Sequence, residues 1–346
     1  MIDMKEKQPA KTDVAVLLLF FTRTEHTKRT FAQICKARPS KLFLYQDGPR
    51  VNNKDDQKNI LECREAIESM IDWDCQVFRM YQEKNYGCDP SEYISQKWMF
   101  SHVDKGIIIE DDDVMAESFF PFCAELLDKY ENDTRINMIC GQNHLDVYDE
   151  CKSDYFFSRR GGIWGWATWK RTIDTWDPSY KFLDDKYTVS CLKRKYGKNF
   201  ISRFMNTCIF HKKQGKEFYE SIRSSNQYVN SQFNIVPKRN MTCNIGIGME
   251  STHSVSKITL QPRKLRRVFF QNVYEISFPL KHPKYVVEDV GYAKKVEYLM
   301  GGSWFSKTFR LLTLEGRLYK VLPFLGEIFS RKTLERVERF KKNQVI

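Results

Sequence analysis

Apolar runs and stretches with helical spacing alternate along the first 140 residues. Residues 14–21 and 41–45 are short apolar runs typical of buried strands, and the segment between them has the spacing of a helix. Residues 60–71 predict a second helix, and residues 76–81 a third strand. The chain therefore begins as strand, helix, strand, helix, strand.

A third helix is expected to begin at Asp89. In this interpretation Asp89 is the N-cap, Pro90 stands in the first turn, and Glu92 completes a capping box. The same helix is expected to end near Gly106.

A fourth strand and a fourth helix follow. Ile107–Ile109 is fully apolar, as in the interior of a parallel sheet. Ser118 is expected to cap a helix with four apolar side chains on one face, Phe119, Phe122, Leu126 and Tyr130. The alternation predicts an α/β fold with a mostly parallel sheet flanked by helices.

Ligands of such sheets bind beyond the carboxyl ends of the strands. Three segments stand at those positions: Thr22-Arg23, Gln46–Arg50 and Glu110–Asp113. These segments are therefore the candidates for a functional site.

The four consecutive carboxylates of Glu110–Asp113 repel one another, and a divalent cation would relieve that repulsion. Carboxylate oxygens suit Mg²⁺ or Mn²⁺, which keep positions open for phosphate oxygens. A solvated acidic turn is the alternative. The metal interpretation implies a diphosphate as a further ligand, on whose leaving group the ion acts as a Lewis acid.

Two other residues at this edge have a functional and an ordinary interpretation. Arg23 is placed to make a bidentate contact with phosphates, or is an ordinary surface arginine. Asp47 is placed to accept a hydrogen bond from the imide of a uracil, or belongs to an Asp-Gly turn.

Composition narrows the class of protein and its partners. The 346 residues contain 56 Lys and Arg against 44 Asp and Glu, a net charge of +12, with 42% hydrophobic content. These values exclude a disordered or collagen-like chain and favour a partner with negative charge, which is a nucleic acid, a membrane surface or a phosphorylated small molecule.

Compartment follows from the cysteines and from the apolar runs. The ten cysteines are scattered without any C-x-x-C pair, which favours free thiols in a reducing cytoplasm. The longest apolar run has eight residues and the N-terminus is polar, so neither a spanning helix nor a signal peptide is expected.

The end of the chain is basic. From Ser303 onward ten Lys and Arg face four Asp and Glu, interleaved with apolar residues. This tail is either an interfacial anchor on the anionic inner face of the plasma membrane or an amphipathic helix packed on the domain.

Several short motifs occur together in a characteristic order. They are Phe20–Thr27 (FFTRTEHT), Leu44–Arg50 (LYQDGPR), Glu83–Gly87 (EKNYG), Ile107–Asp112 (IIIEDD), Trp164–Trp169 (WGWATW), Asn244–Gly248 (NIGIG) and Ser251–Ser254 (STHS). Across about residues 14–290 the chain resembles bacterial nucleotide-diphospho-sugar transferases of the Rossmann-like GT-A fold, often labelled haemolysin-activation-like. More distantly it is similar to the type-I N-acetylglucosaminyltransferases.

The resemblance implies a metal-dependent, inverting glycosyltransferase with Mn²⁺ or Mg²⁺ as cofactor. It would move a hexosyl or N-acetylhexosaminyl group from a UDP-sugar donor to a hydroxyl of a glycan or lipid-linked glycan acceptor, in surface polysaccharide biosynthesis. Asp112 would hold the metal, Asp111 contact the ribose and Glu110 a hydroxyl of the donor sugar. Arg23 matches a diphosphate contact, Asp47 a residue near the uracil.

The resemblance also suggests less certain site residues. Glu220 stands 17 residues before Pro237, where related chains have the general base, and a salt-bridging glutamate is the competing interpretation. His253 matches a late histidine that reaches the metal or diphosphate, or is an ordinary loop histidine. Trp164 and Trp166, in a group of four tryptophans within 13 residues, are candidates to contact a sugar ring, or are core residues.

The predicted organisation is one GT-A domain over residues 12–255, with a nucleotide-sugar half (about 12–140) and an acceptor half (about 141–255). A basic, helical extension over 256–346 follows.

Nucleic-acid binding is disfavoured because no helix-turn-helix, zinc-finger or RNA-recognition signature is present. A nucleotidyltransferase would have a glycine-rich loop after the first strand, which is missing here, so the remaining alternative is an inactive sugar-nucleotide-binding or scaffold protein. The sugar and the acceptor are not identified by the sequence.

Overall fold

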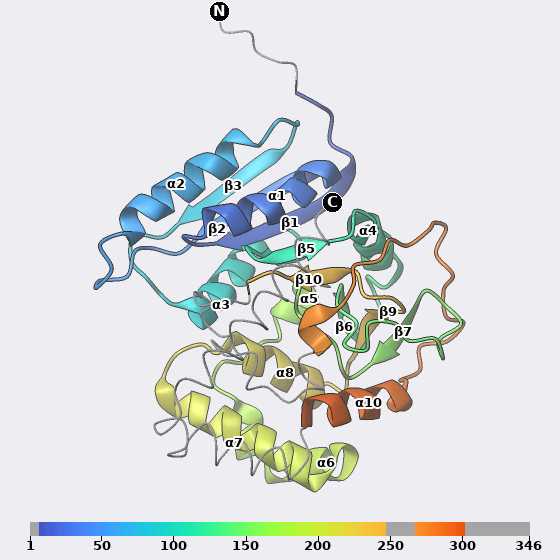
Figure 1. Cartoon of the computed structure of the whole chain (residues 1–346). Coiled ribbons are helices and arrows are strands. Elements are labelled where there is room, and N and C mark those ends of the chain that lie inside the picture. Colours follow the sequence, from blue (N-terminus) through green and yellow to red (C-terminus); the bar gives the residue numbers. More distant parts are fainter. Residues whose placement is uncertain (1–6, 247–266, 302–346) are drawn as a thin grey trace, which may run out of the picture.

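An eight-stranded sheet runs through the protein, as the computed structural model in Figure 1 shows for the described residues, 7–246 and 267–301. In spatial order its strands are β3 (Gln76–Tyr81), β2 (Pro39–Gln46), β1 (Thr12–Phe20), β4 (Lys105–Glu110), β8 (Trp166–Trp169), β6 (Ile136–Cys140), β9 (Phe233–Pro237) and β7 (Tyr155–Ser158). A separate antiparallel pair joins β5 (Asp113–Met115) to β10 (Thr242–Asn244).

Nine α-helices are described around these strands. They are α1 (Thr24–Ala37), α2 (Asp56–Ser69), α3 (Cys88–Met99), α4 (Phe119–Lys129), α5 (Lys170–Ile173), α6 (Lys186–Tyr196), α7 (Lys198–Gln214), α8 (Tyr219–Val229) and α10 (Val290–Gly301). Short 3₁₀ turns occupy Lys181–Asp184 and Arg267–Phe270. The predicted α/β class is confirmed.

The half of the sheet that the sequence predicts best is parallel throughout. Strands β3, β2, β1 and β4 are parallel neighbours, joined by helices α1, α2 and α3. Beyond β4 the sheet is mixed, because β8 runs antiparallel between β4 and β6, and β7 antiparallel to β9. The carboxyl ends of β1, β2 and β4 therefore meet at one edge.

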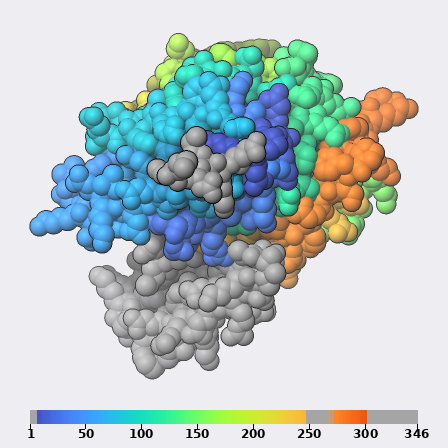
Figure 2. Space-filling view, turned by 90° about the horizontal axis from the view of Figure 1, so that it is seen from above, coloured from blue at the N-terminus to red at the C-terminus, as the bar shows by residue number. Residues whose placement is uncertain are grey.

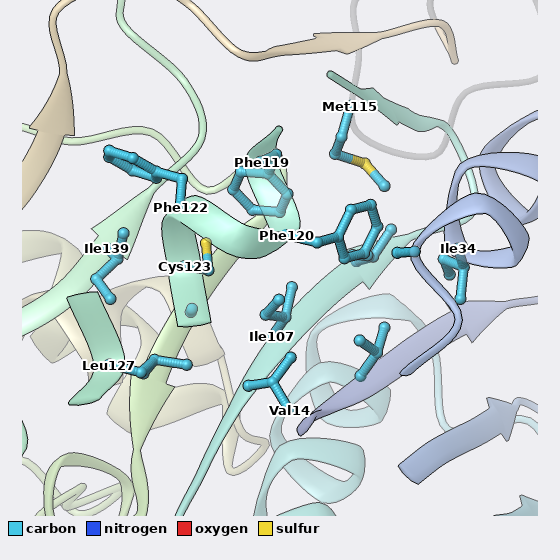
Figure 3. Packing of buried hydrophobic residues seen from close by; sticks show 14 of the residues in the cluster. Val14, Ile34, Ile107, Met115, Phe119, Phe120, Phe122, Cys123, Leu127 and Ile139 are labelled. Carbon is cyan, nitrogen blue, oxygen red and sulfur yellow. The ribbon is translucent and has the colours of Figure 1, made fainter. Parts of the chain in front are cut away.

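Alternate residues of β1 face opposite sides of the sheet, and each side has its own core. Val14, Val16 and Leu18 face the core covered by α1, α2 and α4, whereas Ala15 and Leu17 face the core covered by α3, α8 and α10. Figure 3 shows the first core, where the side chains of α4 pack over strand residues. Because both faces are buried, the central strands are continuously apolar.

Helix α3 departs from its prediction. It begins at Cys88 with Gly87 as N-cap, so the capping box of Asp89 and Glu92 is wrong. Gly87 has a φ of 85°, which glycine adopts readily. The Glu92 side chain is buried and accepts a hydrogen bond from Gln96 (2.8 Å) instead of turning back to the helix start. The helix also ends at Met99, earlier than Gly106.

Helix α4 has the predicted buried face and a different cap. Ser118 is its N-cap residue, but the carboxylate of Glu275 does the capping: it accepts hydrogen bonds from the backbone N–H groups of Glu117 (2.9 Å) and Ser118 (2.8 Å). The Ser118 hydroxyl also donates to Glu275. Figure 2 shows the orange residues around 275 lying beside the green ones of this region.

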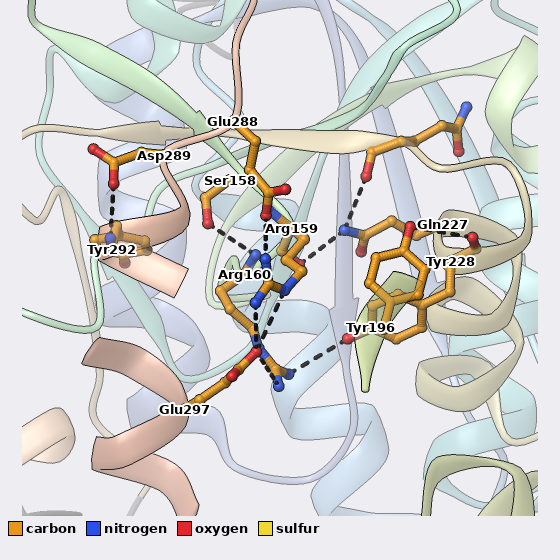
Figure 4. A network of polar contacts seen from close by, with 11 residues as sticks. Ser158, Arg159, Arg160, Tyr196, Gln227, Tyr228, Glu288, Asp289, Tyr292 and Glu297 are labelled. Atoms are coloured by element: carbon orange, nitrogen blue, oxygen red, sulfur yellow. Dashed lines mark hydrogen bonds and ion pairs between the residues drawn. The ribbon is translucent and has the colours of Figure 1, made fainter. Parts of the chain in front are cut away.

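The described part of the predicted extension is tied to the rest of the protein. Arg159 pairs with Glu288 (2.7 Å) and with Glu297 (3.1 Å), and Arg160 pairs with Glu297 (3.2 Å), as Figure 4 shows. Tyr292 of α10 is fully buried. The expected domain boundary at residue 255 and the basic tail from residue 303 lie outside the described residues and stay predictions.

The structure bears on two expectations, one about the cysteines and one about helices that could span a membrane. All ten cysteines are free thiols, and Cys123 and Cys140 lie in the core. Within residues 7–246 and 267–301, no helix combines the length and apolarity that crossing a bilayer requires.

Replacing Glu275 by alanine should lower the free energy of unfolding by about 1–2 kcal/mol, because two N–H groups at the start of α4 lose their acceptor. Chemical denaturation measures this change. Glu62→Ala, on an exposed position of α2, is the matched control and should stay within about 0.5 kcal/mol of wild type. Equal effects from both variants would contradict the capping role.

Candidate functional site

A cavity of about 490 Å³ opens at the carboxyl ends of β1, β2 and β4, a volume typical of small-molecule sites. Four residues singled out from the sequence line it, namely Arg23, Asp47, Glu110 and Asp111. They come from the ends of three different strands. Parallel pairing of these strands brings them together, as the edge rule for α/β sheets predicts.

Arg23 is held by the acidic segment. Its Nε donates to Asp111 Oδ2 (3.2 Å), its terminal nitrogen contacts the other oxygen of Asp111, and the same nitrogen lies 2.8 Å from Asp112 Oδ2. Burial lowers the pKa of Arg23, but the two aspartates outweigh it and raise the pKa above its usual value. Arg23 is therefore a fixed cation at the edge of the cavity, and its contact with a diphosphate stays a prediction.

The carboxylates outnumber this one cation. Burial, and then the charge of Glu92, raises the pKa of Glu110 well above its ordinary value. Burial raises the pKa of Glu92 to about 8 and that of Asp111 to about 6, although Arg23 opposes the rise at Asp111. Each raised pKa favours the neutral acid, so this edge of the sheet holds more carboxyl groups than the described protein groups keep ionised.

Asp112 is held in place by residues that are distant from it in the sequence. Asn244 donates its amide to Asp112 Oδ1 (2.5 Å). The backbone of Gly246 approaches so closely that a Cβ there would lie 1.7 Å from Asp112 Oδ2. A side chain at position 246 would displace Asp112 or Arg23, so glycine is required for this close approach.

Asp113, whose role the resemblance left open, has a structural contact. It is fully buried, and its Oδ2 accepts a hydrogen bond from the backbone N–H of Gly165 (2.8 Å). Gly165 has a φ of 60°. This bond fixes the turn that carries Trp164. The Trp164 ring is half-buried and lies beside Phe269, with ring centres 5.4 Å apart.

Trp166 requires a correction. It belongs to β8, and only 2% of its surface is exposed because its ring packs in the core with the α3 and α8 residues. A ring this buried presents no face to a sugar, so the core interpretation holds for Trp166.

Asp47 makes structural contacts at the wall of the cavity. Both of its carboxylate oxygens accept hydrogen bonds from protein donors: the backbone N–H groups of Gly48 (2.9 Å), Tyr86 (2.9 Å) and Gly87 (3.0 Å), and the amide of Asn85 (2.9 Å). Asp47 thus ties the loop before α3 to the end of β2. A uracil contact would have to replace one of these bonds, and it stays a prediction.

Glu220 stands in the first turn of α8 and is exposed. Its charge contributes to the raised pKa values of the buried Glu92 and Tyr219, as does that of Glu110 at Tyr219. Glu220 is therefore near enough to Glu92 for their charges to interact, although it is not among the residues that line the cavity, and its role as general base stays a prediction. His253 lies outside the described residues.

The oxygen-rich donor set of Asp111, Asp112 and Asn244 is chemically suited to a hard divalent cation. Within the described part of the chain, no group of three or more His, Cys, Asp or Glu side chains is arranged to hold a metal ion. The guanidinium of Arg23 contacts both aspartates, as a bound cation would. These residues fit an ion held by one or two protein ligands, with the remaining positions left for a ligand that the ion shares.

Three of the residues that line the cavity, Glu92, Asn85 and Arg50, received no individual role at the site from the sequence. Glu92 was assigned to a cap, and only its burial reveals its place at the site. Asn85 and Arg50 both belong to motifs recognised in the sequence, and these motifs could have indicated that the two residues lie at the site. Arg50 makes a bidentate pair with the buried Asp56, with both N–O distances 2.7 Å, at the rim.

No protein-family model and no curated protein matches this chain. Among solved structures, a UDP-glucose pyrophosphorylase complexed with UDP-glucose aligns with a TM-score of 0.32 and 10% identity, over 65% of this chain and 90% of that one. The glycosyltransferase GlyE from Streptococcus pneumoniae TIGR4 aligns with a TM-score of 0.32 and 11% identity, over 86% of this chain and 64% of GlyE, just under two thirds of its length. At these scores neither alignment identifies a family or a shared site.

Replacing Glu92 by glutamine should make the protein more stable at pH 8 than wild type, by about 1 kcal/mol or more. The folded pKa of about 8 exceeds the ordinary value of 4.5, so the folded state favours the neutral acid. The stability due to Glu92 is complete below about pH 4.5 and is lost as the pH rises toward 8.

Thermal unfolding at pH 5 and pH 8 measures this difference. Glu65→Gln, an exposed glutamate on α2, is the control and should leave the pH dependence unchanged. A wild-type pH dependence that persists in Glu92→Gln would show that Glu92 is not the titrating group.

Proposed function

We propose that this chain is a metal-dependent, inverting glycosyltransferase of the GT-A type. It would transfer a sugar from a UDP-sugar to a hydroxyl of a glycan or lipid-linked glycan, in surface polysaccharide biosynthesis. The observation that carries this proposal is the cavity at the carboxyl edge of the sheet, where Arg23, Glu110 and Asp111 converge. The sequence motifs of the donor half support it.

Binding of the donor is assigned to the cavity. Asp111 would accept from the ribose hydroxyls and Glu110 from a hydroxyl of the sugar. Arg23 would exchange part of its contact with Asp111 and Asp112 for the diphosphate, to which a guanidinium binds in the same bidentate way. Asp47 acts by positioning Asn85–Gly87 at the wall of the cavity.

A divalent ion, Mn²⁺ or Mg²⁺, would be held by Asp112, with Asp111 beside it. When bound it supplies Lewis-acid stabilisation of the leaving diphosphate. Asn244 orients the Asp112 carboxylate, and Arg23 provides a second positive charge that remains with the protein. The predicted contribution of His253 belongs to this part of the proposal.

Glu220 is the proposed general base. The acceptor oxygen attacks the anomeric carbon from the face opposite the diphosphate, and its proton passes to the Glu220 carboxylate as the new C–O bond forms. The bond from the anomeric carbon to the diphosphate oxygen breaks, and UDP leaves with that electron pair. One displacement of this kind inverts the anomeric configuration.

A donor screen tests the reaction class. The full chain, incubated with Mn²⁺ and each nucleotide sugar, should release UDP from at least one UDP-sugar, and EDTA should abolish the release. No release from any donor, with or without glycan acceptors, would favour the inactive sugar-nucleotide-binding or scaffold protein instead.

Glu220→Gln tests the base. Turnover should fall by about 10²–10⁴-fold because the proton acceptor is lost, while UDP binding measured by calorimetry should be unchanged. Glu217→Gln, a partly exposed glutamate in the loop before α8, is the matched control and should retain activity. Unchanged turnover in Glu220→Gln would exclude the role of Glu220 as base.

A further inference from the structure

The helical hairpin formed by α6 and α7 concentrates positive charge. Residues 186–216 contain nine Lys and Arg and no Asp or Glu. Eight of the nine are exposed, and they are Lys186, Arg194, Lys195, Lys198, Arg203, Lys212, Lys213 and Lys216. The excess of +9 in this one segment is three-quarters of the net charge of +12 of the whole chain.

The hairpin forms an outer layer of the molecule. Both helices pack on α8, which in turn covers the sheet, and Figure 1 shows α6 and α7 as the layer farthest from α1 and α2. A small core that includes Leu192, Ile201 and Met205 holds the hairpin together.

Three large apolar side chains are exposed at one end of this hairpin. Tyr187 is 73% exposed, Ile209 41% and Phe210 57%. The ion pair between Asp184 and Lys212 (3.5 Å) joins the start of α6 to the end of α7, which brings Tyr187 to the same end as Ile209 and Phe210. We name Tyr187, Ile209 and Phe210 the apolar tip.

Exposed lysines flank the apolar tip in the sequence. Lys186 precedes Tyr187, and Lys212, Lys213 and Lys216 follow Phe210. The two carboxylates on the other side are already engaged, since Asp184 pairs with Lys212 and Asp185 caps α6 by accepting the backbone N–H of Tyr187 (2.9 Å). Exposed apolar side chains ringed by lysines are typical of surfaces that enter the interface of an anionic bilayer.

The apolar tip lies close to the proposed catalytic edge. His211, next to Phe210, stacks on Phe218 with ring centres 3.8 Å apart and an interplanar angle of 11°. Its Nδ1 is 2.8 Å from the hydroxyl of Ser221, the residue after Glu220. A surface bound through the tip would therefore lie beside the first turn of α8.

We propose that the α6–α7 hairpin docks the protein on an anionic lipid bilayer, with Tyr187, Ile209 and Phe210 inserted into the interface and the surrounding lysines on the lipid headgroups. This surface is distinct from the predicted tail anchor. Docking would place Glu220 opposite an acceptor that is carried by a lipid in that bilayer. This statement about the acceptor rests on the proposed function.

Headgroup attraction and apolar insertion contribute separately. Each lysine near an anionic surface strengthens binding by about fivefold, and this part weakens with salt. Burial of the tip adds a part that salt does not screen. A soluble polyanion, such as an acidic glycan or a nucleic acid, would use the lysines alone.

Co-sedimentation of the full chain with vesicles tests the proposal. Binding is expected to phosphatidylcholine vesicles that contain 30 mol% phosphatidylglycerol, roughly, and to be much weaker with pure phosphatidylcholine. The variant Lys213→Glu/Lys216→Glu should lose at least about tenfold in affinity. The variant Ile209→Ser/Phe210→Ser should lose about tenfold with no change of charge.

Matched controls come from α2 and the loop before it. Lys54→Glu/Lys58→Glu makes the same change of net charge on exposed lysines, and Val51→Ser/Leu61→Ser removes two exposed apolar side chains. Both controls should bind vesicles as wild type does. Circular dichroism of each variant verifies the fold.

Three results would overturn the proposal. One is unchanged vesicle binding in both hairpin variants. This result counts against the hairpin whether or not deletion of residues 303–346 abolishes vesicle binding. Another is loss in Lys213→Glu/Lys216→Glu only, which would show that the apolar tip does not enter the bilayer. The third is equal loss in the α2 controls.

UDP release from a soluble donor separates this proposal from the proposed function. Hairpin variants should keep wild-type UDP binding, and Glu220→Gln should keep wild-type vesicle binding. If no donor releases UDP, the transferase is rejected while the vesicle result still decides the docking surface.

Discussion

The repulsion among the carboxylates at the end of β4 is the constraint on which the rest of the site depends. Glu110, Asp111 and Asp112 follow a buried strand, and Glu92 of α3 lies against the same edge. Because water is largely excluded there, each charge raises the pKa of its neighbours. A protein retains such an arrangement at a cost in stability, which is common where binding or catalysis requires charge.

Several distant segments share in balancing that charge. Arg23 reaches it from the end of β1, Asn244 from the end of β10, and the backbone of Gly165 supports Asp113. None of these contacts is local in sequence, so the site exists only when the sheet is complete. Stability and site geometry are therefore coupled, and substitutions that weaken the pairing of β10 with β5 should also release Asp112.

The parallel half of the fold could be predicted from the sequence because apolar runs and helix faces, the two signals used for it, are both local. Apolar runs such as Ile107–Ile109 and helix faces such as that of α4 depend on spacing alone. The edge rule then placed Arg23 and Asp111 together correctly. The mixed half was not predicted, since the antiparallel insertion of β8 between β4 and β6 depends on which distant strands pair.

Errors in the site have the same origin. Glu92 looked like a capping residue because its spacing from Asp89 fits a capping box, whereas its side chain accepts a hydrogen bond from Gln96 of the same helix and lines the cavity. Trp166 looked like a ligand platform because aromatic residues serve both as platforms and as core. Glu275, which caps α4 from 157 positions away, gave no local signal at all.

Asp47 has a consequence for how a ligand would be received. Its carboxylate accepts hydrogen bonds from Asn85, Tyr86 and Gly87 and so holds this loop against the end of β2, which means that the protein's own contacts fix this wall of the cavity. A ligand that enters does not have to order the loop, and the entropy of ordering it is lost during folding rather than during binding. Selection among ligands at this wall is therefore by fit to a fixed shape, and a ligand too large for it is refused rather than accommodated.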